Sequence, residues 1–224
     1  MKFNHIFKLT NENETHREYK CDNVNINIDF ISGSALRVAV FNDNAEMLPT
    51  FTVNPNNNLS SLGRSRLSVD GFDCVAPVVE KFENKEKFVL DCGVTVDLDL
   101  NNFILSYSKE SKLLFADRAP LAYNFEGEFG NGSYHYITRE DDEHIFGLGD
   151  KSGLINKAGQ VYRVETADSM GFDAEKTDPL YKHVPFYICE NSVGAYGIYY
   201  DTTDTSFVDL GREINNYYCH FKYF

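Results

Sequence analysis

The sequence predicts an all-β fold, a large antiparallel β-sandwich, and three observations lead to this prediction. Apolar and polar residues alternate with a period of two in many short runs, which is typical of half-buried strands. Glycine and asparagine separate these runs, as expected for the turns between strands. Apolar residues nowhere recur at helical spacing over a helix-length window. Many short strands with such turns favour a sandwich over other architectures.

The first third of the chain contains two clear alternating runs. After a short strand at residues 3–9 and a polar stretch, residues 24–30 alternate between aliphatic or aromatic and polar side chains. Ser32, Gly33 and Ser34 then turn the chain, and residues 36–40 alternate again, which predicts a hairpin. Residues 42–63 carry few apolar positions and are expected to form a long loop.

The middle of the chain adds a second hairpin. Residues 94–100 and 103–107 alternate on either side of Asn101 and Asn102, and two turn-forming residues between two such runs are a hairpin signal. A Gly-Asn loop is expected at 126–133. The remaining expected strands are 72–79, 88–90, 113–115, 134–139, 160–165, 181–188 and 195–200.

Composition and charge restrict the possible functions. The chain has 224 residues, a net charge of −13 and a pI near 4.8, which disfavours nucleic acid and anionic membranes as partners. The five cysteines are scattered, which favours free thiols in a reducing compartment. No signal peptide or membrane-spanning apolar segment is recognisable. We therefore expect a cytoplasmic protein with no membrane partner.

The stretch from 144 to 207 carries a series of motifs in a fixed order. It resembles the N-terminal domain of glycoside hydrolase family 31, the α-glucosidase and α-xylosidase family. The matching segments are Phe146-Gly147-Leu148-Gly149-Asp150, residues 159–162, the loop that ends at Asp168, residues 178–182, residues 185–188 and residues 197–201.

The resemblance implies a galactose mutarotase-like supersandwich that covers residues 1–224 as a single N-terminal domain. In the family, a catalytic (β/α)₈ barrel follows this domain and supplies both catalytic carboxylates of a retaining mechanism. That barrel is absent from this chain, so the resemblance implies no catalytic residue here, and the chain alone is expected to be inactive. The implied partners are the barrel and an α-linked oligosaccharide substrate of the parent α-glucosidase. An aromatic strand at 217–224 also suggests a possible homo-oligomer.

Asp168 is the residue that the resemblance singles out. The family's corresponding loop carries a Trp-Asn-x-Asp pattern whose aspartate bonds substrate hydroxyls, and this chain has Glu165, Thr166, Ala167 and Asp168 there. A carboxylate suits this role because it accepts charge-assisted hydrogen bonds from adjacent hydroxyls. The alternative is a turn aspartate that bonds its own backbone. Phe172 is a second candidate, which either stacks on a sugar or fixes the loop.

No metal site or cofactor is expected. The six histidines show no His-x-His or His-x-x-x-His pairing, so the sequence does not indicate zinc. Gly147 and Gly149 are not followed by a helical pattern, which argues against a phosphate-binding loop.

Two alternative functions stay open at this point. One is a stand-alone carbohydrate-binding module; sugar-binding platforms favour exposed aromatic residues, and the absence of tryptophan counts against this alternative. The other is an aldose 1-epimerase-like enzyme, which needs a histidine acid and a glutamate base facing one pocket. His135, His144 and Glu143 are the residues that this second alternative would use.

Overall fold

The computed structural model describes residues 5–50, 52–53, 55, 64–125 and 132–213, together with the backbone of 218–223. No helix occurs in these residues, and the strands pair antiparallel throughout, which confirms the predicted all-β class. Accordingly, the described residues include no helix long and apolar enough to cross a membrane. The chain divides into two compact units, Met1–Ser111 and Lys112–Phe224, and each is described by itself. The single domain over 1–224 stays a prediction.

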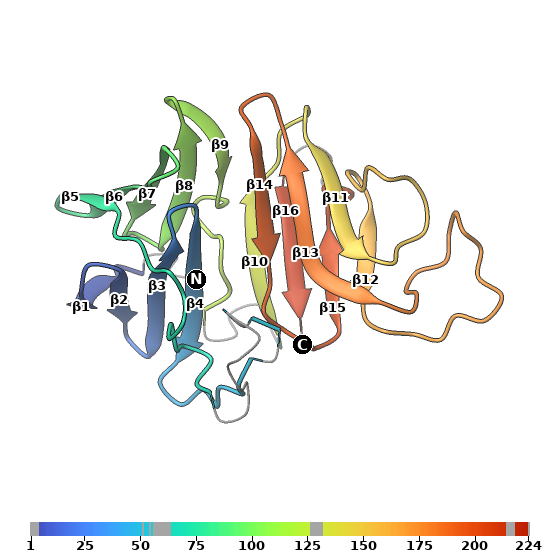
Figure 1. The fold of residues 1–224 in the computed structure, drawn as a ribbon, viewed down its shortest axis with the longest axis horizontal. Helices are drawn as coiled ribbons and strands as arrows, with labels where there is room; N and C mark the ends of the chain where they lie inside the picture. The colour runs from blue at the N-terminus through green and yellow to red at the C-terminus, as the bar shows by residue number, and fades with distance from the viewer. Residues whose placement is uncertain are drawn as a thin grey trace. The chain divides into compact units, whose positions relative to one another are not determined.

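The first unit contains eight strands that belong to two sheets (Figure 1). One sheet has the order β1-β2-β3-β4, and in the other the strands of this unit follow the order β5-β6-β7-β8. The bounds are β1 (Lys8–Glu12), β2 (His16–Cys21), β3 (Val24–Ser32), β4 (Ala35–Asn42), β5 (Val78–Lys81), β6 (Lys85–Val89), β7 (Val94–Asp99) and β8 (Ile104–Lys109).

Aromatic rings connect the inner faces of these two sheets. The Phe30 ring on β3 lies 5.1 Å from the Phe88 ring on β6, measured between centroids. Phe103 contacts Phe7 and Tyr19 edge-on at 5.4 Å each. All five rings are at most 1% exposed, so they form the core of a sandwich.

Strand β3 differs from the expected half-buried strand. Its apolar residues point into the core as predicted, but Asn27 and Asp29 on the polar face are also buried, at 7% and 2% exposure. The reason is that Arg37 on β4 bonds Asp29 and also the backbone carbonyls of Arg66, Leu67 and Ser68, so the 66–68 segment covers this face.

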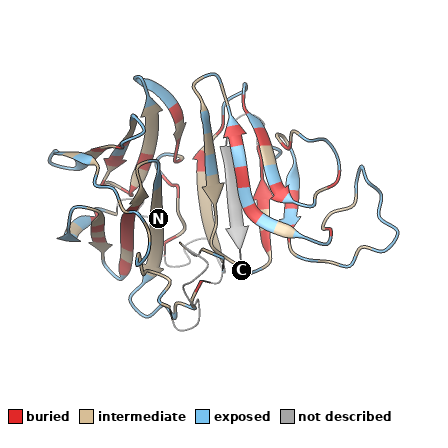
Figure 2. Cartoon of the chain, in the orientation of Figure 1, coloured by how far each residue is buried: buried red, intermediate tan, exposed pale blue. Residues whose placement is uncertain are grey.

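The second unit is built from two more sheets, with the orders β10-β16-β15-β12 and β11-β13-β14. Alternate residues of β13 are buried and exposed, which Figure 2 shows as bands along that strand. The bounds are β9 (Lys112–Ala116), β10 (Ser133–Thr138), β11 (His144–Gly149), β12 (Val161–Val164), β13 (His183–Glu190), β14 (Ala195–Tyr199), β15 (Ser206–Asp209) and β16 (Tyr218–Tyr223).

Both sheets of this unit contribute to one core. Its buried members come from β10, β11, β12, β13 and β15 and from the segment after β15. They are Ile137, Ile145, Leu148, Tyr162, Val164, Tyr187, Cys189, Val208 and Leu210. This core fixes the strand ends from which the loops described below project.

The Phe-Gly-Leu-Gly-Asp motif is the end of strand β11, with a register irregularity, rather than a tight turn. Gly147 and Gly149 have positive φ values of 129° and 80°. A Cβ atom on Gly147 would lie 2.6 Å from the Phe186 carbonyl oxygen of β13. Glycine is therefore required here because the two backbones approach closely.

Candidate functional site

The candidate site is the loop between β12 and β13, residues 165–182, which carries both predicted site residues. Its two arms are joined by hydrogen bonds: the Ala167 amide donates to the Leu180 carbonyl over 3.0 Å, and Ser169 Oγ donates to the Pro179 carbonyl over 2.7 Å. Thr166 Oγ1 and His183 Nδ1 lie 2.9 Å apart at the base. The loop thus has an ordered stem that leads to its tip.

Asp178 and Lys151 anchor this stem to the body of the unit. Lys151 Nζ donates to Asp178 Oδ1 over 2.8 Å and also to the Arg163 carbonyl. The second carboxylate oxygen of Asp178 accepts the Arg163 amide over 2.6 Å. The Lys151 side chain is fully buried and that of Asp178 is 17% exposed. Acidic composition alone would place Asp178 in solvent with Asp173 and Glu175, but its pairing with Lys151 holds it in the stem.

Asp168 is exposed on the loop stem. It lies between Ala167 and Ser169, whose hydrogen bonds join the two arms of the loop. Its carboxylate accepts no hydrogen bond from any residue that the structure describes. The turn-forming role belongs instead to Asp173, whose Oδ1 accepts the Glu175 amide over 2.8 Å. The Asp168 carboxylate is therefore held on an ordered segment while its oxygens stay available to a ligand.

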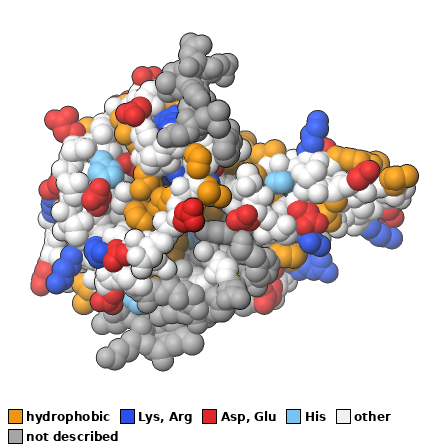
Figure 3. All heavy atoms as spheres, turned by 90° about the horizontal axis from the view of Figure 1, so that it is seen from below, with side chains coloured by type: hydrophobic (Ala, Val, Ile, Leu, Met, Phe, Trp, Pro, Cys, Tyr) orange, Lys and Arg blue, Asp and Glu red, His pale blue; other side chains and the backbone are white. Residues whose placement is uncertain are grey.

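Phe172 lies nearer the tip and is 51% exposed. Its ring has no aromatic partner in the described part of the chain. Met170 in the same loop is 86% exposed, and Leu154 and Ile155 in the β11–β12 loop are 81% and 79% exposed. The Gly153 amide donates to the Ala174 carbonyl over 2.9 Å, so the two loops contact each other. Figure 3 shows hydrophobic side chains exposed where these loops protrude.

The epimerase alternative would use three residues that each bond different partners, namely His135, His144 and Glu143. His135 bonds Asp117 over 3.0 Å and the Tyr200 hydroxyl over 2.9 Å. The Asn156 amide donates to His144 over 3.0 Å.

Glu143, the base of that alternative, is buried at 3% exposure, and Tyr196 donates to it over 3.3 Å. Burial raises the pKa of Glu143 to about 7. Such a pKa suits a general base, but within the described part of the chain neither histidine hydrogen-bonds Glu143.

A small cavity of about 300 Å³ opens on the polar face of the β1–β4 sheet. Its lining includes two amides, two carboxylates and an aromatic ring, from Asn25, Asn27, Glu18, Asp43 and Phe41. Asn25 donates to Asp43 over 2.6 Å, whereas the Asn27 side chain hydrogen-bonds no described residue although it is only 7% exposed. Amides, carboxylates and an aromatic ring together match the hydroxyls and apolar faces of a sugar.

The family resemblance pointed to the loop and to Asp168 as a predicted site, but nothing in the sequence indicated Lys151 or the cavity. Lys151 carries no sequence signal because its importance depends on burial beside Asp178. Alternation placed Asn25 and Asn27 on one strand face, but the sequence does not indicate that Leu67 lines a cavity together with them.

Comparisons with known proteins support the resemblance. Residues 25–209 match the family model described as "Glycosyl hydrolase 31 N-terminal galactose mutarotase-like domain". Alpha-glucosidase 2 of Bacillus thermoamyloliquefaciens is 25% identical over 112 residues, which are 50% of this chain and 14% of that protein.

Solved structures share the fold. A family 31 dextranase of Flavobacterium johnsoniae, solved with isomaltotriose, matches with a TM-score of 0.74 and 21% identity over 100% of this chain and 25% of its own. A cycloalternan-forming enzyme of Listeria monocytogenes, solved with a pentasaccharide substrate, matches with a TM-score of 0.74 and 14% identity over 98% of this chain and 19% of its own. The chain thus spans at most a quarter of the length of these relatives.

Proposed function

The chain belongs to the family of glycosyl hydrolase 31 N-terminal galactose mutarotase-like domains, and on this premise we propose that it is the non-catalytic N-terminal part of a retaining α-glucosidase. In this proposal the parent enzyme acts on α-linked oligosaccharides, and its catalytic (β/α)₈ barrel lies outside this chain. The chain supports the barrel and contributes the 165–182 loop to the mouth of the active site.

This proposal rests mainly on the exposure and hydrogen bonding of the Asp168 carboxylate. Its carboxylate is exposed, bonds none of the described residues and lies on a stem held by the Lys151–Asp178 pair. A carboxylate positioned in this way accepts hydrogen bonds from two neighbouring sugar hydroxyls without first breaking bonds of its own. The chain therefore offers a preorganised contact to a sugar rather than a catalytic pair.

Two further features support the barrel-packing role. The loop tips expose Leu154, Ile155 and Met170 by 79–86%. Strand β13 exposes Val184, Phe186 and Ile188, all on one face. Grouped exposed apolar side chains are typical of protein–protein contact surfaces.

The test is Asp168→Ala in the full parent enzyme, measured on an α-linked disaccharide and on an aryl α-glucoside. Loss of a hydrogen bond to a charged group costs about 1.5–3 kcal/mol. We therefore expect kcat/KM for the disaccharide to fall roughly ten- to a hundred-fold. The aryl substrate should be affected much less, because its leaving group lacks the hydroxyls.

The matched control is Asp173→Ala, which removes an exposed carboxylate from the same loop that bonds only within its own turn. It should leave the ratio of the two kcat/KM values unchanged. Equal losses on both substrates for Asp168→Ala, together with a lower Tm, would show that Asp168 serves the loop and not the substrate.

Direct carbohydrate binding by the first unit is a second candidate function, and the Asn27 amide favours it. This amide is nine-tenths buried, lines the cavity and bonds no described residue. Titration of the chain with maltose or isomaltotriose, followed by NMR, should perturb the side-chain amide resonances of Asn25 and Asn27, which both line the cavity. Asn27→Ala should abolish the response of Asn25, and a response of Asn25 that survives this change would exclude the cavity as the binding site.

A further inference from the structure

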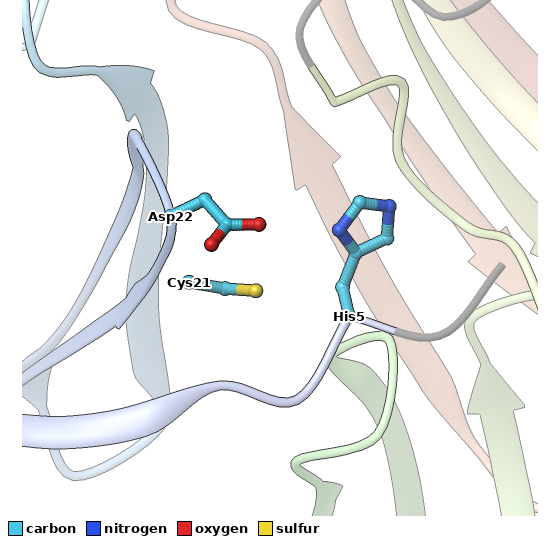
Figure 4. A group of neighbouring side chains, drawn as sticks. All are labelled: His5, Cys21 and Asp22. Carbon is cyan, nitrogen blue, oxygen red and sulfur yellow. The ribbon is translucent and has the colours of Figure 1, made fainter. Parts of the chain in front are cut away.

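Three metal-ligating side chains converge in the first unit, where His5 meets two adjacent residues from a later hairpin, Cys21 and Asp22. His5 lies before β1, Cys21 ends β2, and Asp22 forms part of the β2–β3 turn. One ligand atom from each lies within 4.8 Å of the other two. Figure 4 shows the three side chains pointing toward one another. We propose that His5, Cys21 and Asp22 bind a zinc-like divalent transition-metal ion.

The backbone holds each of these residues independently of an ion. The His5 amide donates to Asn102 Oδ1 over 2.9 Å, and the His5 carbonyl accepts the Asn102 amide over 2.7 Å. Asn102 is buried, at 9% exposure. The N-terminal segment is thus fixed at the residue that carries the imidazole.

The hairpin between β2 and β3 fixes the other two ligands. Cys21 pairs with Val24 as the last pair of the antiparallel ladder. Asp22 follows with a φ of 52°, in the left-handed region that aspartate tolerates better than most residues. The end of β2 and the first residue of the turn therefore present a sulfur and a carboxylate from adjacent positions toward His5.

The chemistry of the three ligands selects the class of ion. Imidazole nitrogen, thiolate sulfur and carboxylate oxygen are all ligands of Zn²⁺, whereas Ca²⁺ and Mg²⁺ prefer oxygen alone. Zn–ligand distances of about 2.0–2.3 Å place tetrahedral ligand atoms roughly 3.5 Å apart. Ligand atoms that now lie within 4.8 Å of one another need to close by about an ångström. The fourth tetrahedral position remains open to water.

Charge also favours a cation at this place. A thiolate and a carboxylate together neutralise a divalent ion, and the net charge of −13 attracts cations to the chain in general. A bound ion would connect the N-terminal segment to the β2–β3 hairpin. Because the ion binds the folded state, it would raise the Tm with increasing metal concentration. The site is separate from the 165–182 loop, so it does not depend on the proposed function.

Cobalt binding to the reduced 224-residue chain, freed of metal with a chelator, tests the proposal. Co²⁺ should produce a thiolate-to-cobalt absorption band in the near ultraviolet. Zn²⁺ should displace it, and Mg²⁺ and Ca²⁺ should not. Cys21→Ser should remove the band, while Cys92→Ser, which changes an exposed thiol elsewhere in the first unit, should retain it. His5→Gln and Asp22→Asn should each weaken cobalt binding by at least about tenfold.

Two outcomes would overturn the proposal: no band in the unmodified chain, or a band that survives Cys21→Ser but not Cys92→Ser. Metal-free melting curves show whether each variant folds. If Cys21→Ser is unfolded, His5→Gln decides the question, because its side chain is outside the strand ladder. Zn²⁺ should then raise the Tm of the unmodified chain and not that of His5→Gln.

Discussion

His16, Asp29 and Arg37 form a charged row across strands β2, β3 and β4. His16 Nδ1 lies 2.6 Å from Asp29 Oδ1, and Arg37 Nη2 donates to Asp29 Oδ2 over 2.7 Å. Glu18 lies 3.0 Å from His16 Nε2. Burial alone would lower the pKa of His16, but the hydrogen bonds and charges of Glu18 and Asp29 outweigh it, so the pKa is raised above 6.5.

This shift predicts a pH dependence of stability. A histidine whose pKa is raised by folding contributes stability that is fully present below its unfolded pKa, near 6.5, and is lost as pH rises through the folded pKa. The Tm difference between the unmodified chain and His16→Gln should therefore be larger at pH 6 than at pH 8.5. Melting curves of both proteins across this range provide the measurement.

His183 provides a control because folding shifts its pKa in the opposite direction to that of His16. Burial, together with the nearby Lys151 charge, lowers the pKa of His183 below 6.5. The folded state therefore resists protonation, and the unmodified chain should lose stability relative to His183→Gln as pH falls below about 6.5. The same slope for both variants would mean that the histidines respond to the net charge of the chain and not to their own surroundings.

At the scale of single residues, the sequence indicated residues that belong to a recognisable motif. It gave no sign of residues whose role depends on contacts that form only in the folded chain. Asp168 was identified because the surrounding motifs follow a family order. Lys151 has no such mark, although its ammonium holds the loop stem. His5 and Cys21 are too far apart in sequence to form a spacing pattern, and the backbone bonds between the His5 segment and Asn102 help bring the imidazole to the hairpin.

At the scale of the elements, the ion pair between Lys151 and Asp178 holds the stem of the 165–182 loop. Lys151→Met removes the ammonium and leaves Asp178 with the Arg163 amide alone. Loss of a hydrogen bond to a charged group costs about 1.5–3 kcal/mol. The stem should therefore open more often, and the amides of Arg163 and Ala167 should exchange with deuterium roughly ten- to a hundred-fold faster.

The matched control for this change is Lys176→Met at the tip of the same loop. Lys176 is exposed, and its backbone amide, which donates to the Asp173 carbonyl over 3.2 Å, is retained by methionine. Exchange at Arg163 and Ala167 should stay as in the unmodified chain. If both variants accelerate exchange equally, the loop is held by its total charge rather than by the Lys151–Asp178 pair.

The strands themselves were predictable wherever one face is apolar. β3, β4, β7 and β8 were expected from alternation, and β13 was expected from its β-branched and aromatic residues. β2 was missed because Arg17, which is buried at 5% exposure, occupies a position that polar composition assigns to solvent. β15 was missed because Ser206 and Asp209 are buried by neighbouring strands and by the bonds of Asp209 to the following amides. In both cases hydrogen bonding replaces apolar character as the reason for burial.

At the scale of the whole molecule, the sequence suggested self-association through residues 217–224, and this stays a prediction because their side chains lie outside the described residues. The described residues expose a further apolar face on β13, where Val184, Phe186 and Ile188 are 37–45% exposed. On this face Ile188 pairs with Phe146 on β11 and with Gly197 on β14. Gly197 has no side chain, and the Phe186 ring packs against it, since a Cβ atom there would lie 2.8 Å from Phe186 Cε2.

This surface predicts that the chain self-associates when nothing covers it. Exposed apolar side chains grouped on one sheet face lower their free energy by burial against a second copy, by about 25 cal/mol per Å² of apolar area. Light scattering should show a mass above that of one chain as concentration rises. The double substitution Val184→Thr and Ile188→Thr keeps two β-branched residues in the strand and should shift the equilibrium toward monomer.

The control is Val78→Thr on β5, which changes a single valine that is 66% exposed in the first unit. A chain that stays monomeric at every concentration, or an equal response to Val78→Thr, would rule out the β13 face as the contact surface.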